Sequence, residues 1–164
     1  MLGGYADVKL RVAEPARCVH LVQALGIHAP GSGLPRLSRL ELTFNQAITA
    51  AGVAALADSP RFATLRTLWL RQCPEIGSPG AAAIARSPHA ANLTDLNLLE
   101  CGIGPDGAAA LAASPHLSGL TRLQLRGNPL DDASRQQLRE RFGDRVELGD
   151  EGRTKLAARR TDAG

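Results

Sequence analysis

The sequence repeats itself four times at an almost constant interval. The copies begin "LSRLELTFN" at Leu37, "LRTLWLRQC" at Leu65, "LTDLNLLEC" at Leu93 and "LTRLQLRGN" at Leu120. A unit this short cannot bury its own apolar face, so it is stable only when it stacks on a neighbouring unit. The repetition therefore predicts a row of like units with one shared core.

The first half of each copy alternates apolar and polar residues as a strand does. Two leucines per copy point to one side, and the residues between them point to the other. These inward columns are Leu40, Leu68, Leu96 and Leu123, followed by Leu42, Leu70, Leu98 and Leu125. The sequence predicts one short strand in each copy.

The second half of each copy has helical spacing, for example over residues 48–57. Small residues share a column there (Gly52, Gly80 and Gly107), which would let neighbouring helices approach closely. Ser78 followed by proline is typical of a helix N-cap. A proline in each copy is expected to end the helix, because the residue before proline avoids the α conformation; these prolines are Pro60, Pro88 and Pro115.

These columns resemble the leucine-rich repeat, L-x-x-L-x-L-x-x-N/C-x-L, over residues 37 to about 142. The long period and helical second half are similar to the ribonuclease-inhibitor-like subclass. The runs "GVAALA", "GAAAIA" and "GAAALA" resemble the GALA-type repeats of some bacterial proteins. The resemblance implies an α/β fold: a short right-handed solenoid, with parallel strands on the concave face and helices on the convex face. It also suggests a bacterial source.

The two ends depart from the repeat. Residues 1–36 are interpreted as a degenerate N-terminal capping unit, with a strand around Val8, Leu10 and Val12 and then a helix whose apolar face includes Cys18. Residues 37–148 are assigned to four repeats and a C-terminal cap that closes with a strand near Val146 and Leu148. Residues 149–164 are polar and are expected to form a flexible tail.

Composition excludes several classes of protein. The net charge is only +3 and the basic residues are spread along the chain, so nucleic acid is not expected as a partner. No apolar run is long enough to span a bilayer, and the N-terminus does not read as a signal peptide. Three cysteines without a secretion signal favour free thiols and a cytoplasmic location.

Two cysteines and two histidines raise the question of a zinc site or a nucleophilic thiol. Cys73 and Cys101 share a column with asparagines, where the family normally uses the side chain to hydrogen-bond buried backbone in the turn. His89 and His116 precede the next strand, whereas the cysteines follow one, so the two sets are separated by a strand length of about 17 Å. Zinc ligands lie about 2.0–2.3 Å from the metal, which excludes a joint site. We therefore expect a structural ladder of Asn45, Cys73, Cys101 and Asn128, with no metal, cofactor or catalytic residue.

The resemblance implies that a partner binds the outward-facing strand positions on the concave face. These positions are Arg39, Thr67, Asp95 and Arg122; Glu41, Trp69, Asn97 and Gln124; and Thr43, Arg71, Leu99 and Arg126. Tryptophan and arginine are enriched in interface hot spots, which favours Trp69 and Arg71 as anchors. The alternative is that Trp69 only covers its neighbours on a short sheet.

These observations favour a non-catalytic protein-interaction module or scaffold, and not an enzyme. One alternative is a regulator of an enzyme, such as an inhibitor or a GTPase activator that presents Arg71 or Arg126 from a strand end. A second alternative is a fragment of a larger repeat-containing effector. Self-association through the shallow sheet also stays open.

Overall fold

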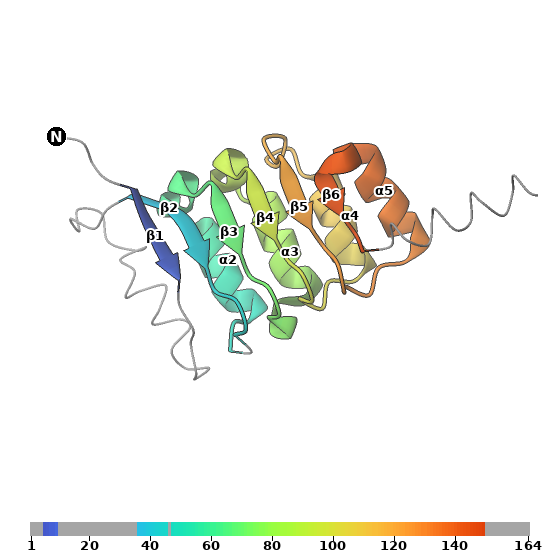
Figure 1. The fold of residues 1–164 in the computed structure, drawn as a ribbon, viewed down its shortest axis with the longest axis horizontal. Coiled ribbons are helices and arrows are strands. Elements are labelled where there is room, and N and C mark those ends of the chain that lie inside the picture. The colour runs from blue at the N-terminus through green and yellow to red at the C-terminus, as the bar shows by residue number, and fades with distance from the viewer. Residues whose placement is uncertain (1–4, 10–35, 46, 150–164) are drawn as a thin grey trace, which may run out of the picture.

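The computed structural model describes residues 5–9, 36–45 and 47–149 (Figure 1). Within these residues the strands form one sheet whose spatial order follows the chain, and every neighbouring pair is parallel. The strands are β1 (Tyr5–Lys9), β2 (Arg36–Glu41), β3 (Thr67–Trp69), β4 (Asp95–Asn97), β5 (Arg122–Gln124) and β6 (Val146–Glu147). The predicted α/β repeat architecture is confirmed.

One α-helix follows each of the strands β2 to β5, and Figure 1 shows these helices behind the sheet. They are α2 (Ala50–Asp58), α3 (Gly77–Arg86), α4 (Pro105–Ala113) and α5 (Asp132–Phe142). Short 3-10 helices lie in the connections: η1 (Pro60–Thr64), η2 (Pro74–Ile76), η3 (Pro88–Asn92) and η4 (Gly143–Arg145). The helices thus cover one face of the sheet and leave the other face without a described helix.

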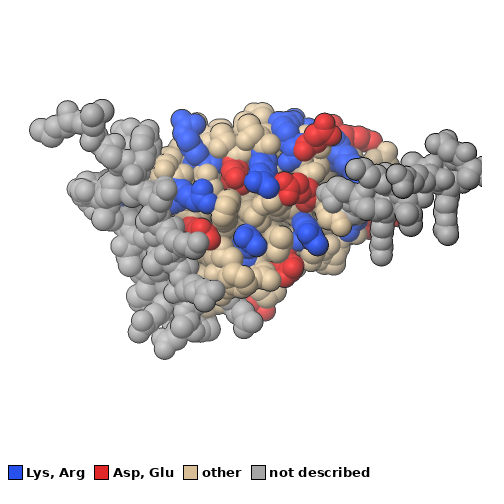
Figure 2. Space-filling model, in the orientation of Figure 1, with Lys and Arg blue, Asp and Glu red and all other residues tan. Residues whose placement is uncertain are grey.

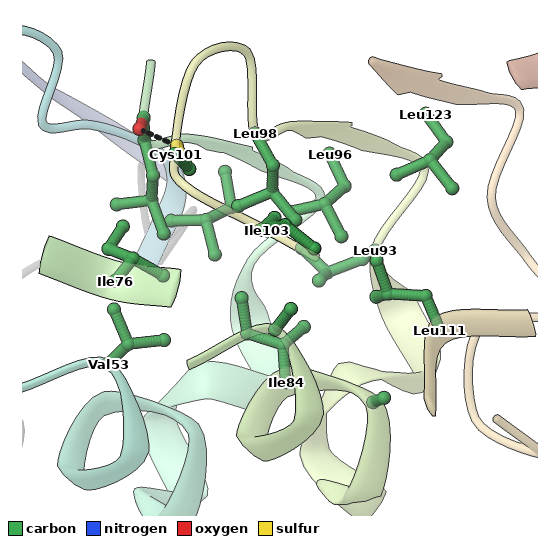
Figure 3. Close-up of a cluster of buried hydrophobic side chains, with 14 of the residues drawn as sticks. Val53, Ile76, Ile84, Leu93, Leu96, Leu98, Cys101, Ile103, Leu111 and Leu123 are labelled. Carbon is green, nitrogen blue, oxygen red and sulfur yellow. Dashed lines mark hydrogen bonds between the residues drawn. The ribbon is translucent and has the colours of Figure 1, made fainter. Parts of the chain in front are cut away.

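The leucine columns align because the strands pair without a register shift from β2 to β5. Leu40 pairs with Leu68, Leu68 with Leu96, and Leu96 with Leu123. All four side chains are fully buried in a core that continues from one repeat to the next. Figure 3 shows Leu96 and Leu98 above Ile84 of α3, with Ile103 between the layers. Each repeat thus supplies one slice of a common core.

Helices α2, α3 and α4 each end immediately before a serine–proline pair, but these residues do more than stop the helix. Pro60 and Pro88 each open a 3-10 helix. The buried serine before the proline links successive repeats: Ser87 Oγ donates to Ala57 O at 2.5 Å, and Ser114 Oγ donates to Ala85 O at 2.6 Å. This serine ladder was not predicted from the sequence, although its period matches that of the leucines.

The prediction that Ser78 caps α3 is wrong. The helix begins at Gly77, and its N-cap residue, Ile76, makes no capping bond with its side chain. Ser78 Oγ instead accepts a hydrogen bond from Gly104 N of the next repeat at 2.9 Å. Gly77 adopts a left-handed φ of +55° and donates its N–H to Cys101 O at 3.0 Å. Bonding between repeats therefore replaces local capping at this helix start.

The small-residue column brings the helices into close contact. A Cβ atom on Gly107 would lie 2.9 Å from Ser78 Cα of α3 and 2.7 Å from Ile103 Cγ2. A Cβ on Gly80 would lie 2.5 Å from Ile76 Cγ2 and 3.5 Å from Ala50 Cα of α2. Alanine in place of Gly107 would push neighbouring helices apart.

The two ends are described in part. Val8 lies in β1, which pairs with β2, whereas Leu10, Val12 and Cys18 fall outside the described residues. At the other end β6 contains Val146 and pairs with β5, and Leu148 is buried. The predicted flexible tail falls almost entirely outside the described residues, and the unit boundaries remain predictions.

Gly107→Ala is expected to lower the free energy of unfolding by about 1–3 kcal/mol, because overpacking at the helix contact outweighs the gain in helix propensity. Gly52→Ala is the matched control, since the nearest described atom to its Cβ is Thr49 Oγ1 at 3.9 Å. It should change stability by no more than about 1 kcal/mol. Urea denaturation followed by circular dichroism measures both. A Gly107→Ala protein as stable as the wild type would contradict close helix stacking.

Candidate binding face

The sheet face opposite the helices, called the open face below, carries three rows of side chains. Strand register forms the first row from Arg39, Thr67, Asp95 and Arg122, and the second from Glu41, Trp69, Asn97 and Gln124. The third row, Thr43, Arg71, Leu99 and Arg126, lies just past the strand ends. Backbone bonds extend the pairing there, from Phe44 N to Arg71 O and from Gln72 N to Leu99 O. The predicted rows are therefore present as rows; their role in binding remains a prediction.

Trp69 lies near the middle of the open face and is held on two sides. Its indole N–H donates to Asp95 Oδ1 at 3.0 Å, and the guanidinium of Arg39 lies over the ring, 4.1 Å from its centroid. The side chain is half-buried. The indole is thus already oriented by charged neighbours on both adjacent strands, β2 and β4.

A second network covers the open face towards β6. Asn97 donates to Gln124 Oε1, and Gln124 donates to Glu147 Oε2 at 2.7 Å. Arg122 pairs with the same carboxylate through Nη2 at 2.9 Å. The hydrogen bond from Gln124, together with Arg122, holds the pKa of Glu147 below its usual range despite partial desolvation. These four side chains satisfy one another and form a fixed polar surface.

Of the three rows on the open face, the third has the fewest side-chain hydrogen bonds and ion pairs to described residues. Thr43 is buried and donates to Glu41 Oε1 at 3.4 Å, and Leu99 is half-buried. The Nε atom of Arg71 is buried yet has no hydrogen-bond partner among the described residues. Arg126 is exposed, and its aliphatic stem packs against Gly149, where a Cβ would lie 2.5 Å from Arg126 Cγ. Two arginines that flank a leucine therefore lie in this row without a described carboxylate partner.

Figure 2 views the open face and shows basic and acidic side chains interspersed over it. No continuous basic track crosses the described part of this face. The arrangement differs from the clustered positive surface with which proteins follow a phosphate backbone.

The asparagine and cysteine column lies inside the turn after each strand. Asn128 is the best connected member: Nδ2 donates to Leu98 O and Leu125 O, both at 2.8 Å, while Oδ1 accepts from Cys101 N and Ile103 N. Cys101 Sγ donates to Leu70 O at 2.8 Å (Figure 3), and Cys73 Sγ donates to Leu42 O at 3.2 Å. Asn45 Nδ2 donates to Thr43 O at 3.2 Å. Most of these contacts tie a turn to the preceding or following repeat.

Burial makes the described cysteines poor nucleophiles. Cys73 and Cys101 are both free and fully buried, and desolvation raises the pKa of the Cys101 thiol to about 12. A reactive cysteine needs a thiolate, which requires a lowered pKa and access to solvent. Neither condition is met at Cys101, whose Sγ instead donates to a backbone carbonyl.

The histidines and the thiols lie at opposite ends of the strands. His89 and His116 follow the serine–proline pairs and precede β4 and β5. The backbone N–H of each histidine donates to the Oγ of the serine two residues earlier, at 3.2 Å. Within the described residues, no group of three or more histidine, cysteine or acidic side chains is arranged to hold a metal ion.

The helices of the described part of the chain include none with the length and apolar character needed to cross a membrane.

A Cys18→Ser variant is expected to resist thiol reagents in its native state, because only Cys73 and Cys101 remain and both are buried. Modification should follow the rate of global unfolding, measured by the absorbance change of an aromatic disulfide reagent. The same variant in denaturing guanidinium should react at once and serves as the control. Immediate reaction of the folded variant would contradict the buried ladder.

Comparison with known families supports the repeat. A protein-family model described as "Leucine Rich repeat" matches residues 35–57, 63–85 and 89–112. Curated protein sequences show no significant match to the chain. The fourth copy lies beyond the matched segments, but it has the same order of strand, buried turn and helix in β5, Asn128 and α5. These matched segments show that the chain contains leucine-rich repeats, and the stacked fold continues the same pattern into the fourth copy.

Proposed function

We propose that this chain is a non-catalytic protein-interaction module that binds its partner on the open face of the sheet. Leucine-rich repeats are in general protein-interaction modules. The proposal rests on the centre of the open face. There Trp69, which is oriented by its hydrogen bond to Asp95, lies next to the half-buried Leu99 and to Arg71, whose Nε has no hydrogen-bond partner among the described residues.

Pre-orientation favours binding at Trp69. A large aromatic side chain normally loses rotamer freedom when a partner immobilises it. Asp95 and Arg39 already restrict the indole, so less entropy remains to be lost on association. Buried aromatic and arginine anchors dominate the energetics of many interfaces. Trp69 and Arg71 have these residue types and lie in neighbouring rows of one repeat.

The charges of the open face favour a protein partner over a nucleic acid. The acidic side chains of Asp95 and Glu147 are partly exposed among the arginines, whereas Glu41 is buried. A polyanion that crossed β4 or β6 would meet the Asp95 or Glu147 carboxylate. A polar protein surface can instead place charges of opposite sign against both the basic and the acidic side chains of the open face.

The proposal includes a finer description of the fold. We infer a right-handed solenoid with the open face on its concave side, because strand–helix–strand crossovers between parallel strands are right-handed in about 98% of cases. The regular period and the full helix in each repeat support the ribonuclease-inhibitor-like, GALA-like subclass. A cytoplasmic location and a bacterial source belong to the same proposal.

Regulation of a GTPase has less support from the site. An activating arginine must reach a bound nucleotide. No sequence motif singles out Arg71 or Arg126 for this role, and the carboxylates of Asp95 and Glu147 on the same face would repel nucleotide phosphates.

A double variant, Trp69→Ala with Arg71→Ala, is expected to lose the partner that the wild-type chain captures from native lysate. Recovery in a pull-down with quantitative mass spectrometry should fall at least about tenfold, since removal of interface anchors costs about 2 kcal/mol or more. Arg86→Ala with Asp106→Ala is the control, because both residues are exposed on helices.

Melting curves establish that each variant is folded, and Leu99→Glu provides a second test if the tryptophan variant is unstable. Retention of the partner by folded open-face variants, or its loss in the helix control, would contradict binding on the open face.

A further inference from the structure

We propose that the third row of the open face binds an extended acidic segment of a partner protein, with two carboxylates that pair with Arg71 and Arg126. This inference rests on the proposed function and specifies the chemistry of the partner. It follows from three observations: which charges of the open face are already paired, how far apart the unpaired ones lie, and which ligands the other rows repel.

The arginines of the open face differ in their contacts. Arg122 is paired with Glu147, and Arg39 lies over the ring of Trp69. Neither Arg71 nor Arg126 has a side-chain hydrogen bond or ion pair to any described residue, and the Nε of Arg71 is moreover enclosed. A guanidinium group has five N–H donors, so both arginines keep donors that a carboxylate from outside can bind even though the Nε of Arg71 is enclosed.

The chemistry of these two arginines matches a carboxylate. Guanidinium groups bind carboxylates through two parallel N–H···O bonds, which are stronger than neutral hydrogen bonds. The third row itself contains no acid, because its other members are Thr43 and Leu99. A partner carboxylate would therefore meet two positive charges without competition inside the row.

The spacing fits an extended peptide that runs across the strands. Neighbouring strands lie about 4.8 Å apart, so the backbones of Arg71 and Arg126, on either side of Leu99, are about 10 Å apart. A polyproline II segment rises about 3.1 Å per residue and repeats every third residue. Side chains at i and i+3 thus project to the same side about 9.3 Å apart, and the intervening residues pass over Leu99. The predicted motif is acidic–x–x–acidic with an apolar residue between the acids.

The other rows disfavour a denser anion. A nucleic acid strand carries one phosphate about every 3.4 Å and could not confine its charge to one row. It would approach Asp95 in the first row or Glu147 beside the second row, both of which are partly exposed. A segment with two separated carboxylates and apolar residues avoids this repulsion and can also contact Trp69.

Selection of short random peptides displayed on phage tests the proposal. The bait is the full chain as wild type, as Arg71→Glu with Arg126→Glu, and as Arg86→Glu with Arg139→Glu. The last variant is the matched control, since it makes the same change in net charge at exposed positions on helices α3 and α5. Wild type and control should enrich the acidic–x–x–acidic motif about fivefold or more over the starting library, and the open-face variant should not.

A synthetic peptide from the selection then gives the affinity. Trp69 is the only tryptophan, so its fluorescence reports binding to the open face directly. Single reversal of either third-row arginine should raise Kd at least about tenfold, because it removes an ion pair and adds a repulsion. The control variant should bind as the wild type does.

Peptides that need Trp69 or Leu99 but show no acidic enrichment would overturn this inference and leave the proposed function intact. Failure of the wild type to enrich any peptide would also overturn the inference alone. Peptides that bind equally well to every open-face variant would overturn both. Acidic peptides selected equally by the open-face and control variants would show a nonspecific charge effect and overturn only the inference.

Discussion

Strands β2 to β5 are each followed by a turn whose peptide groups are buried, and every other feature depends on how those groups are satisfied. Burying these peptide groups without hydrogen bonds would destabilise a small repeat by more free energy than its packing supplies. Asn128 serves four such groups, and Cys101 reaches the carbonyl of Leu70 in the preceding repeat. The residue before each ladder position is left-handed, with φ of +55° in Gln72 and Glu100 and +75° in Gly127. The turn geometry thus sets the register of the whole stack.

Register in turn creates the open face. Because Thr67, Asp95 and Arg122 pair in sequence across parallel strands, side chains one full repeat apart in the chain become neighbours. The tryptophan of one repeat can then bond the aspartate of the next, and Gln124 can reach Glu147. The helices behind the sheet pack through glycines and serines, which holds the strands at fixed spacing. A rigid sheet with preset side chains loses little entropy when a partner binds.

Much of this could be predicted, because a repeat places each residue in a column. The buried leucines, the ladder column and the two strand rows follow from period and alternation alone. Ser78 could not be assigned, since a Ser-Pro pair reads as a helix cap until the neighbouring Gly104 is seen to donate to it. The hydrogen bonds from Ser87 and Ser114 also cannot be predicted from the sequence of a single repeat, because their acceptors belong to the preceding repeat. Nor does a column reveal that Arg122 is paired while Arg71 is not.

Methyl and indole resonances offer the most direct test of the claim that the open face is the binding surface. In a heteronuclear NMR titration with a bound peptide or partner, the Leu99 methyls and the Trp69 indole N–H should shift. The methyls of Ala109 and Ala113, exposed on the outer side of α4, should stay in place. Shifts confined to those alanines, with Trp69 and Leu99 unchanged, would place the partner on the helices and contradict the account.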